Sequence, residues 1–125
     1  MSGAERIVLK LFGDFVPEDH GTFAPFYPGV EILPLYGLTK QGEPLDRSQP
    51  SAALLRYAPG AAVPQHRHLA YEHIFIIEGS QSDSYGTYPR GSCVISGPGT
   101  SHAVASEQGC LVLAIWNQSV EVTGK

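Results

Sequence analysis

Glycine and proline divide this chain into short apolar runs, and that pattern restricts the fold more than any other feature. The 125 residues include 14 glycines and 10 prolines. Proline is disfavoured inside helices and central strands, so its clusters end the runs that precede them. Short apolar runs at roughly ten-residue spacing are typical of an all-β sandwich or barrel. We find no linker or internal repeat, and we expect residues 1–125 to form one domain with a barrel core at about 50–118.

The apolar runs predict strands at 7–12, 30–38, 52–58, 92–96, 102–106, 110–116 and 120–122. A short helix is the alternative for the first run, because Ile7 and Leu11 are four residues apart. Pro34 predicts an edge position or a bulge in the second run. Residues 80–89 predict a hairpin with its turn near 83–86. The proline-rich residues 22–28 predict an irregular N-terminal arm that packs aromatic side chains over a core or a subunit interface.

Charge and hydropathy exclude several classes of partner. The net charge is −4 and the chain has no basic stripe, which argues against nucleic-acid binding because phosphate contacts need clustered Lys and Arg. No apolar run approaches the roughly 18 residues of a membrane-spanning helix. A cytoplasmic protein that contacts no membrane is therefore expected. Cys93 and Cys110 are not arranged as a C-x-x-C pair, and we expect both to be small buried apolar residues.

The stretch from residue 60 to 79, G-A-A-V-P-Q-H-R-H-L-A-Y-E-H-I-F-I-I-E-G, contains the residues with the clearest chemistry. His66 and His68 are two apart, so on a strand they point to the same face. Glu72 follows four residues later, and His102 comes after a Gly-Pro-Gly turn. Imidazole and carboxylate groups in this combination suit a first-row divalent metal. We expect the metal ligands to be His66, His68, Glu72 and His102.

Strand parity separates Glu72 from its neighbour His73. In the run that follows, Ile74 and Ile76 share the face of Glu72, while His73 points to the opposite face. A carboxylate on an apolar inward face is costly to bury unless something pairs it, and a metal ion would. His20 is expected to be solvated in a loop, and Arg67 to face away from the two histidines. The aromatic residues are expected to be core or interface groups: Tyr71, Tyr85, Tyr88 and Trp116.

Three nitrogen ligands and one oxygen ligand are compatible with Zn, Fe(II), Mn, Ni or Co. Zinc favours a closed tetrahedral site, whereas Fe(II) favours six ligands with positions open to water, substrate or O₂. Ligand types alone do not distinguish these cases. We therefore expect one divalent metal ion per chain, with Zn or Fe(II) preferred, and assign no catalytic residue.

At these residues the chain resembles the cupin superfamily. Residues 60–79 fill the first cupin motif, G-x5-H-x-H-x3-E-x6-G, without a gap. The second motif, G-x5-P-x-G-x2-H-x3-N, maps onto Gly91, Gly99 and His102, but Gly97 replaces the usual proline and Ser106 the usual asparagine. Runs outside the motifs, such as G-C-L-V-L-A-I-W, resemble the cupin domain of ChrR-type anti-sigma factors and small cupins related to acetylacetone dioxygenases. The resemblance implies a double-stranded β-helix, or jelly-roll barrel, with the metal inside and commonly a homodimer.

Two functions follow from the resemblance, and a third is weaker. The first is a non-catalytic sensor or binding cupin that holds Zn and a small molecule, as in the ChrR-type domain. The chain contains no His-x3-Cys-x2-Cys cluster, so we do not expect a complete anti-sigma factor of that design. The second is an Fe(II) dioxygenase acting on a small diketone or aromatic ketone, in a pocket lined by Ile74, Ile76 and Val104, with Phe23 or Tyr27 from the arm. An isomerase or a metal-free binding barrel is the third.

Overall fold

The computed structural model describes residues 6–124, and nearly all of its regular structure is β-strand. A short 3-10 helix, η1 (Pro17–His20), precedes the strands. In chain order the strands are β1 (Ala24–Tyr27), β2 (Val30–Tyr36), β3 (Ser51–Tyr57), β4 (Ala61–Arg67), β5 (Glu72–Asp83), β6 (Gly86–Pro89), β7 (Cys93–Ser96), β8 (Ser101–Ser106), β9 (Cys110–Trp116) and β10 (Glu121–Val122).

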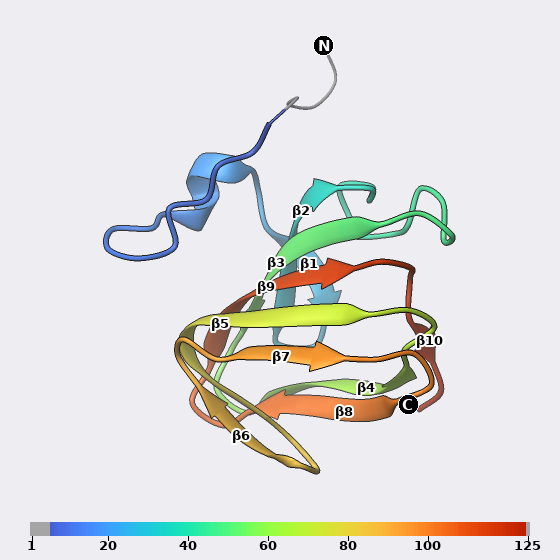
Figure 1. The fold of residues 1–125 in the computed structure, drawn as a ribbon. Coiled ribbons are helices and arrows are strands. Elements are labelled where there is room, and N and C mark those ends of the chain that lie inside the picture. The colour runs from blue at the N-terminus through green and yellow to red at the C-terminus, as the bar shows by residue number, and fades with distance from the viewer. Residues whose placement is uncertain (1–5, 125) are drawn as a thin grey trace.

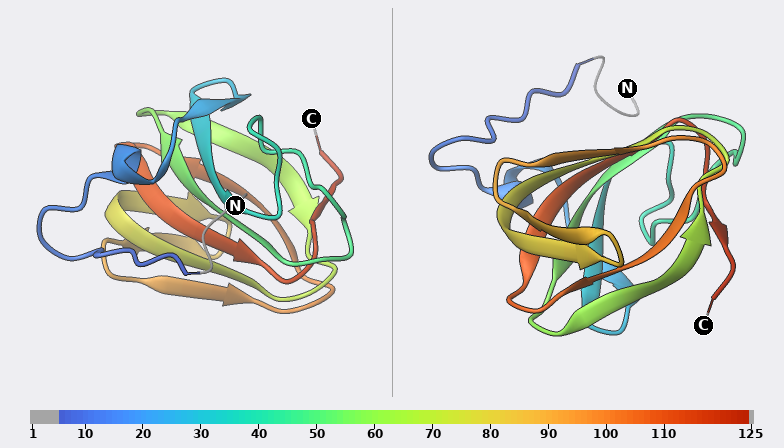
Figure 2. Two further views of the ribbon diagram at one scale, coloured as in Figure 1. Left: turned by 90° about the horizontal axis from the view of Figure 1, so that it is seen from above. Right: turned by 60° about the horizontal axis from the view of Figure 1, so that its bottom comes forward.

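The strands form a curled antiparallel sheet in the order β1-β2-β3-β9-β5-β8-β4-β10, with β6 and β7 paired to β5. In Figure 1, β9, β5 and β7 follow one another from top to bottom, and β4 and β8 lie below them. Figure 2 shows the strands curling into a barrel, with the chain before β1 (residues 6–23), which forms the N-terminal arm, outside it. The predicted all-β jelly-roll fold is confirmed. In the described part of the chain, no helix is long and apolar enough to cross a membrane.

Strand β5 belongs to both sides of the barrel. Its first residues pair with β7 and β9, and its last residues pair with β6 and β8. The register shifts between Ile76 and Glu78, which is a bulge that bends the strand. Gly79 follows with φ of 74°, and a Cβ there would overlap the carbonyl oxygen of Gly109. The bend therefore requires glycine at this position, and it carries Asp83 toward β8.

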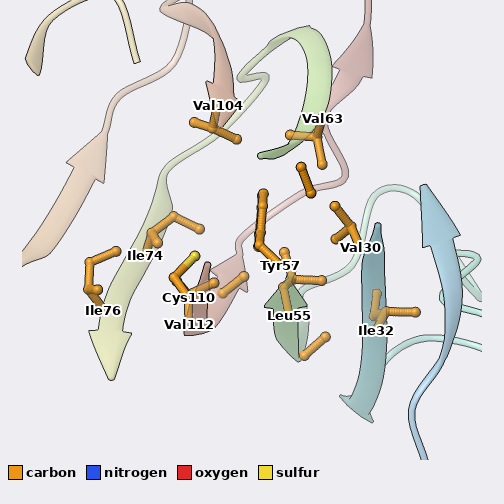
Figure 3. Close-up of a cluster of buried hydrophobic side chains, with 13 residues drawn as sticks. Val30, Ile32, Leu55, Tyr57, Val63, Ile74, Ile76, Val104, Cys110 and Val112 are labelled. Atoms are coloured by element: carbon orange, nitrogen blue, oxygen red, sulfur yellow. The ribbon is translucent and has the colours of Figure 1, made fainter. Parts of the chain in front are cut away.

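Two apolar clusters occupy the two faces of the curled sheet. Ile74 and Ile76 belong to the cluster inside the barrel (Figure 3), and Phe75 and Ile77 belong to the cluster on the outer face. The predicted alternation along this run is therefore confirmed. The prediction for the cysteines is half wrong, because Cys110 is buried but Cys93 is exposed on the edge strand β7.

Two expectations for the N-terminal region are wrong. Residues 7–12 form neither a strand nor a helix, because side-chain packing replaces strand pairing: Leu11 packs on the outer cluster and Phe12 contacts Phe75 edge-on at 6.2 Å between ring centroids. Residues 22–28 are not wholly irregular, since they contain β1 paired with β2. Pro25 is tolerated there because β1 lies at the edge of the sheet, where a missing N–H costs little.

The remaining strand predictions agree with the structure, with ends that shift by a few residues. Pro34 lies in β2 beside a register shift, between Pro34 and Tyr36, as its position in the run predicted. The predicted hairpin is β5–β6, closed by the pairing of Asp83 with Gly86.

Candidate metal centre

Four side chains meet inside one end of the barrel. One ligand atom from each of them lies within 4.8 Å of the others, and all four residues are buried: His66, His68, Glu72 and His102. His66 on β4 and His102 on β8 are direct cross-strand partners. Glu72 is the first residue of β5, and His68 follows β4, where its N–H donates to the carbonyl of Thr100. The antiparallel pairing thus brings together the residues that the sequence singled out as metal ligands.

Backbone acceptors orient the first two rings. Nδ1 of His66 lies 3.0 Å from the carbonyl oxygen of Pro64. Nδ1 of His68 lies 3.1 Å from the carbonyl oxygen of Thr100 and 2.9 Å from its hydroxyl, which itself donates to Gly97. A carbonyl oxygen only accepts hydrogen bonds, so each Nδ1 must carry the proton. In the neutral ring, Nε2 is then an unprotonated lone pair.

A carboxylate orients the third ring. Nδ1 of His102 lies 3.0 Å from Oδ2 of Asp83, whose side chain is only 3% exposed. The hydroxyl of Tyr88 and the N–H of Tyr85 donate to the other oxygen, Oδ1. Burial raises the pKa of Asp83, but these hydrogen bonds outweigh it and hold the pKa below its usual value. Asp83 is therefore an anion, and Nδ1 of His102 also donates.

The Nε2 atoms of all three rings face the carboxylate of Glu72. The distances to its oxygens are 3.0 Å from His68, 3.5 Å from His102 and 3.8 Å from His66. Within residues 6–124, Nε2 of His102 is buried without a hydrogen-bond partner. In a neutral ring whose Nδ1 carries the proton, Nε2 has a lone pair and can only accept a hydrogen bond. The carboxylate of Glu72 can also only accept hydrogen bonds, so neither group donates to the other. Lone pairs converging in this way require a positive charge between them, and the residues present fit a divalent metal ion.

Additional protons would be a poor substitute for that charge. The ring centroids are 4.7 to 5.1 Å apart, so three imidazolium ions would repel one another strongly. Burial lowers the pKa of His66, which keeps that ring neutral. Burial alone would raise the pKa of Glu72, but the three adjacent imidazole rings outweigh it and hold the pKa well below its usual value. Glu72 thus remains an anion at neutral pH.

A small apolar cavity of about 60 Å³ lies beside the cluster, which is room for a few water molecules. His66, Glu72 and His102 form part of its wall. The rest of the wall is mainly apolar, and it includes Leu55, Val63, Ile74, Val104, Phe26, Tyr27, Trp116, Val120 and Val122. The buried polar groups of Tyr57 and Gln81 also line it, and burial raises the pKa of the Tyr57 hydroxyl far above its usual value. A molecule in this cavity would meet the metal ligands directly.

The sequence predictions for residues around this site agree with the structure in part. His73 lies on the outer side of β5, as parity predicted, and Arg67 is exposed. Ile74, Val104 and Tyr27 line the cavity as expected. Ile76 is fully buried in the core instead, and Phe23 packs outside, where its ring lies 3.9 Å below the guanidinium of Arg56.

Three residues that hold the ligands were not predicted from the sequence: Thr100, Trp116 and Asp83. Trp116, expected to be a core or interface aromatic, donates from Nε1 to Oε2 of Glu72 at 2.8 Å. Asp83 was expected only in a hairpin turn. Alternation counted from Glu72 would place Asp83 on the outer face, but the bulge after Ile76 reverses it. The glycine at 79 is the signal in the sequence that could have revealed this bulge.

Comparison with known proteins places this site in a family. Residues 14–119 match the family described as the ChrR cupin-like domain. The chain belongs to this cupin family. The resemblance seen in the motif around His66, His68 and Glu72 is thereby confirmed. A comparison with curated protein sequences found no match.

Solved structures share the fold. The complex of Rhodobacter sphaeroides SigE with the anti-sigma ChrR matches with 25% identity and a TM-score of 0.62, over 76% of this cupin and 49% of that chain. An acetylacetone dioxygenase from Acinetobacter johnsonii matches with 14% identity and a TM-score of 0.73, over 100% and 84% of the two chains. A cupin-like protein of unknown function from Ralstonia eutropha matches with 17% identity and a TM-score of 0.65, over 78% and 60%. The cupin thus spans only about half of the ChrR complex chain that it matches.

Proposed function

We propose that this cupin holds one divalent metal ion through His66, His68, Glu72 and His102, and that it binds a small molecule in the cavity beside the metal. The observation that carries the proposal is the convergence of three Nε2 lone pairs on the carboxylate of Glu72, with each Nδ1 already engaged as a donor. A metal bound there would act as a Lewis acid toward a ligand oxygen or nitrogen. The chain's own residues line the cavity with mainly apolar groups and keep the rings in one orientation.

A sensor or binding role of the ChrR type is the function that we favour. The match of residues 14–119 to the ChrR cupin-like family supports it. Three imidazoles and one carboxylate can close a tetrahedral zinc site without further ligands. In this role, the small molecule would occupy the cavity and alter the surfaces that the barrel presents to a partner.

An Fe(II)-dependent dioxygenase that acts on a small diketone or aromatic ketone is the second candidate. The specific observation in its favour is the mainly apolar cavity against His66, Glu72 and His102, which would hold the body of such a substrate while its oxygens reach the metal. A cavity of about 60 Å³ restricts the enclosed part of the substrate to a few atoms. The rest would extend toward the adjoining surface pocket, which shares with the cavity Phe26, Tyr27, Trp116, Val120 and Val122.

Metal analysis tests the binding site. In protein purified without chelators, we expect a stoichiometric divalent metal in the wild type and none in the variant with His66→Ala and His68→Ala. Circular dichroism should still report a β-rich protein, because the core clusters are untouched. Arg67→Ala is the matched control, since it removes the exposed side chain between the two histidines. Stoichiometric metal in the double variant would disprove the site.

Oxygen consumption separates the two candidate functions. The Fe(II)-loaded protein would be mixed with acetylacetone and, separately, with an aromatic hydroxyketone. Consumption of O₂ that disappears in the double-histidine variant would establish the dioxygenase. Tightly bound zinc, together with no consumption by the Fe(II) form on either compound, favours the binding role.

A further inference from the structure

Asp83 has a buried carboxylate beside the metal centre but is not one of the four candidate ligands. It is the last residue of β5, where the hairpin turns into β6, and its side chain is 3% exposed. Its two oxygens accept three hydrogen bonds, from the Tyr88 hydroxyl at 2.7 Å, the Tyr85 N–H at 2.9 Å and Nδ1 of His102 at 3.0 Å. A carboxylate with this many donors is held in one orientation.

This environment differs from that of the other two ligand histidines. The rings of His66 and His68 donate from Nδ1 to backbone carbonyls, which are neutral. The ring of His102 donates to a charged side chain, and a carboxylate in this position raises the basicity of the opposite nitrogen. Nε2 of His102 is also the ligand nitrogen that is buried without a hydrogen-bond partner among residues 6–124. The carboxylate therefore strengthens the donor nitrogen that most needs a cation.

The charges of the site also balance through Asp83. Glu72 and Asp83 are both buried anions, and the ring of His102 lies between them, with Nε2 3.5 Å from Glu72 and Nδ1 3.0 Å from Asp83. Two buried negative charges are costly unless positive charge pairs with them. A divalent cation bound to the neutral histidines would make the whole cluster neutral. Removing Asp83 would leave that cluster with one uncompensated positive charge.

We propose that Asp83 is a positioning residue of the metal centre: it fixes the Nδ1–H tautomer of His102, makes its Nε2 a stronger ligand and supplies the second negative charge that a divalent cation needs. Tyr88 in turn holds Asp83, so the β5–β6 hairpin is part of the metal centre although it provides no ligand. The inference rests on the proposed metal binding. It adds a group that sets the affinity of the site.

Zinc affinity, measured by competition with a chromogenic chelator, tests the proposal. Asp83→Ala should weaken zinc binding by about 10–100-fold, the usual effect of removing such a partner of a ligand histidine. Asp83→Asn should weaken it less, because the amide oxygen can still accept from Nδ1 while the charge is lost. The matched control is Asp46→Ala, which removes an exposed aspartate whose hydrogen bonds to Ser48 are also local. The affinity of the control should stay within about threefold of wild type.

The ring nitrogens of His102 give a readout that a purely structural role would not change. In metal-free protein at a pH high enough to deprotonate His102, whose pKa the carboxylates of Glu72 and Asp83 raise against the effect of burial, ¹⁵N NMR should show the Nδ1–H tautomer in the wild type. In Asp83→Asn, which preserves the shape of the side chain, that tautomer should persist, and in Asp83→Ala it should give way to a mixture. Amide spectra of each variant would verify that the barrel is folded.

The outcomes separate this inference from the proposed function. Wild-type zinc binding together with Asp83→Ala affinity within about threefold of it would overturn the role of Asp83. An unchanged tautomer in Asp83→Ala would also overturn it. Absence of zinc binding by the wild type would instead contradict the metal proposal, and the tautomer measurement would still decide whether Asp83 orients His102.

Discussion

Trp116 closes the side of the cluster that faces β9. It is the direct cross-strand partner of Glu72, and its indole N–H donates to Oε2, which leaves Oε1 turned toward His68 and His102. Trp has a single donor and no acceptor. The indole therefore fixes the rotation of the carboxylate and cannot compete with it for a cation.

Removing this donor should weaken the metal site without changing its ligands. Trp116→Phe keeps an aromatic ring in the cavity wall but loses the hydrogen bond to Oε2. We expect about tenfold weaker zinc binding, because the carboxylate regains rotational freedom. Chelator competition measures the change, with Tyr36→Phe, an exposed aromatic on β2, as the control. Unaltered affinity in Trp116→Phe would contradict this role.

The bend in β5 is the feature that joins the two sides of the barrel at the metal centre. The bulge after Ile76 reverses the alternation, so Gln81 lines the cavity and Asp83 reaches His102. Gly79 makes the bend possible because its φ of 74° is a region that L-residues rarely adopt. Its backbone also approaches Gly109 too closely for any side chain.

Gly79→Ala should therefore destabilise the fold by more than its backbone conformation alone requires. The left-handed conformation costs an alanine roughly 1–2 kcal/mol, and here a Cβ would also overlap the backbone of Gly109. We expect a loss of at least about 3 kcal/mol in the free energy of unfolding, measured by urea denaturation. Gly91→Ala is the matched control: its φ is 89°, with no atom near the added Cβ. Equal losses in the two variants would show that the close approach does not matter.

Arg56 on β3 attaches the N-terminal arm to the barrel. Its guanidinium donates to Glu31 and to Glu18 and lies over the ring of Phe23. The hydrogen bond from Arg56 is the main reason why the pKa of Glu18 is lowered. A lowered folded-state pKa means that the contact stabilises the arm at pH values above the ordinary pKa of Glu. It is lost as the pH falls through the lowered value.

Arg56→Ala should free the arm without affecting the metal centre. We expect faster amide hydrogen exchange in the arm at neutral pH, and the difference from wild type should shrink below about pH 4, as Glu18 becomes protonated. Zinc affinity should be unchanged. Arg90→Ala, which removes an exposed arginine elsewhere, is the control. The role of Arg56 would be refuted by identical exchange in the two variants at neutral pH.

In the whole molecule, the cavity and the metal centre occupy one side of the curled sheet, and the arm covers part of the other. The inner cluster surrounds the cavity, while Leu11, Phe15 and Phe23 of the arm pack on the outer cluster. The arm therefore lies on the opposite face of the sheet from the candidate metal centre. The homodimer and the cytoplasmic location expected from sequence stay predictions, and light scattering of the purified protein would check the first.

What the sequence determined by itself was the set of candidate metal ligands and the class of fold. Alternation along strands is a local property, so His66, His68 and Glu72 could be placed on one face from spacing alone. Glycine and proline likewise mark where strands end, whatever packs around them. The arm was predicted less well, because residues 7–12 and β1 depend on which neighbours are available for pairing and packing.

Tertiary structure decided how those ligands are held. Thr100, Trp116 and Asp83 lie 32, 44 and 19 positions from the residues that they contact, so no local pattern connects them. Cross-strand register brings Trp116 to Glu72, and the bulge in β5 turns Asp83 inward. Both depend on which strands pair and where the pairing slips, and these are properties of the assembled barrel. The stretch from 60 to 79 identifies the ligand types, but the barrel as a whole gives their lone pairs a common direction.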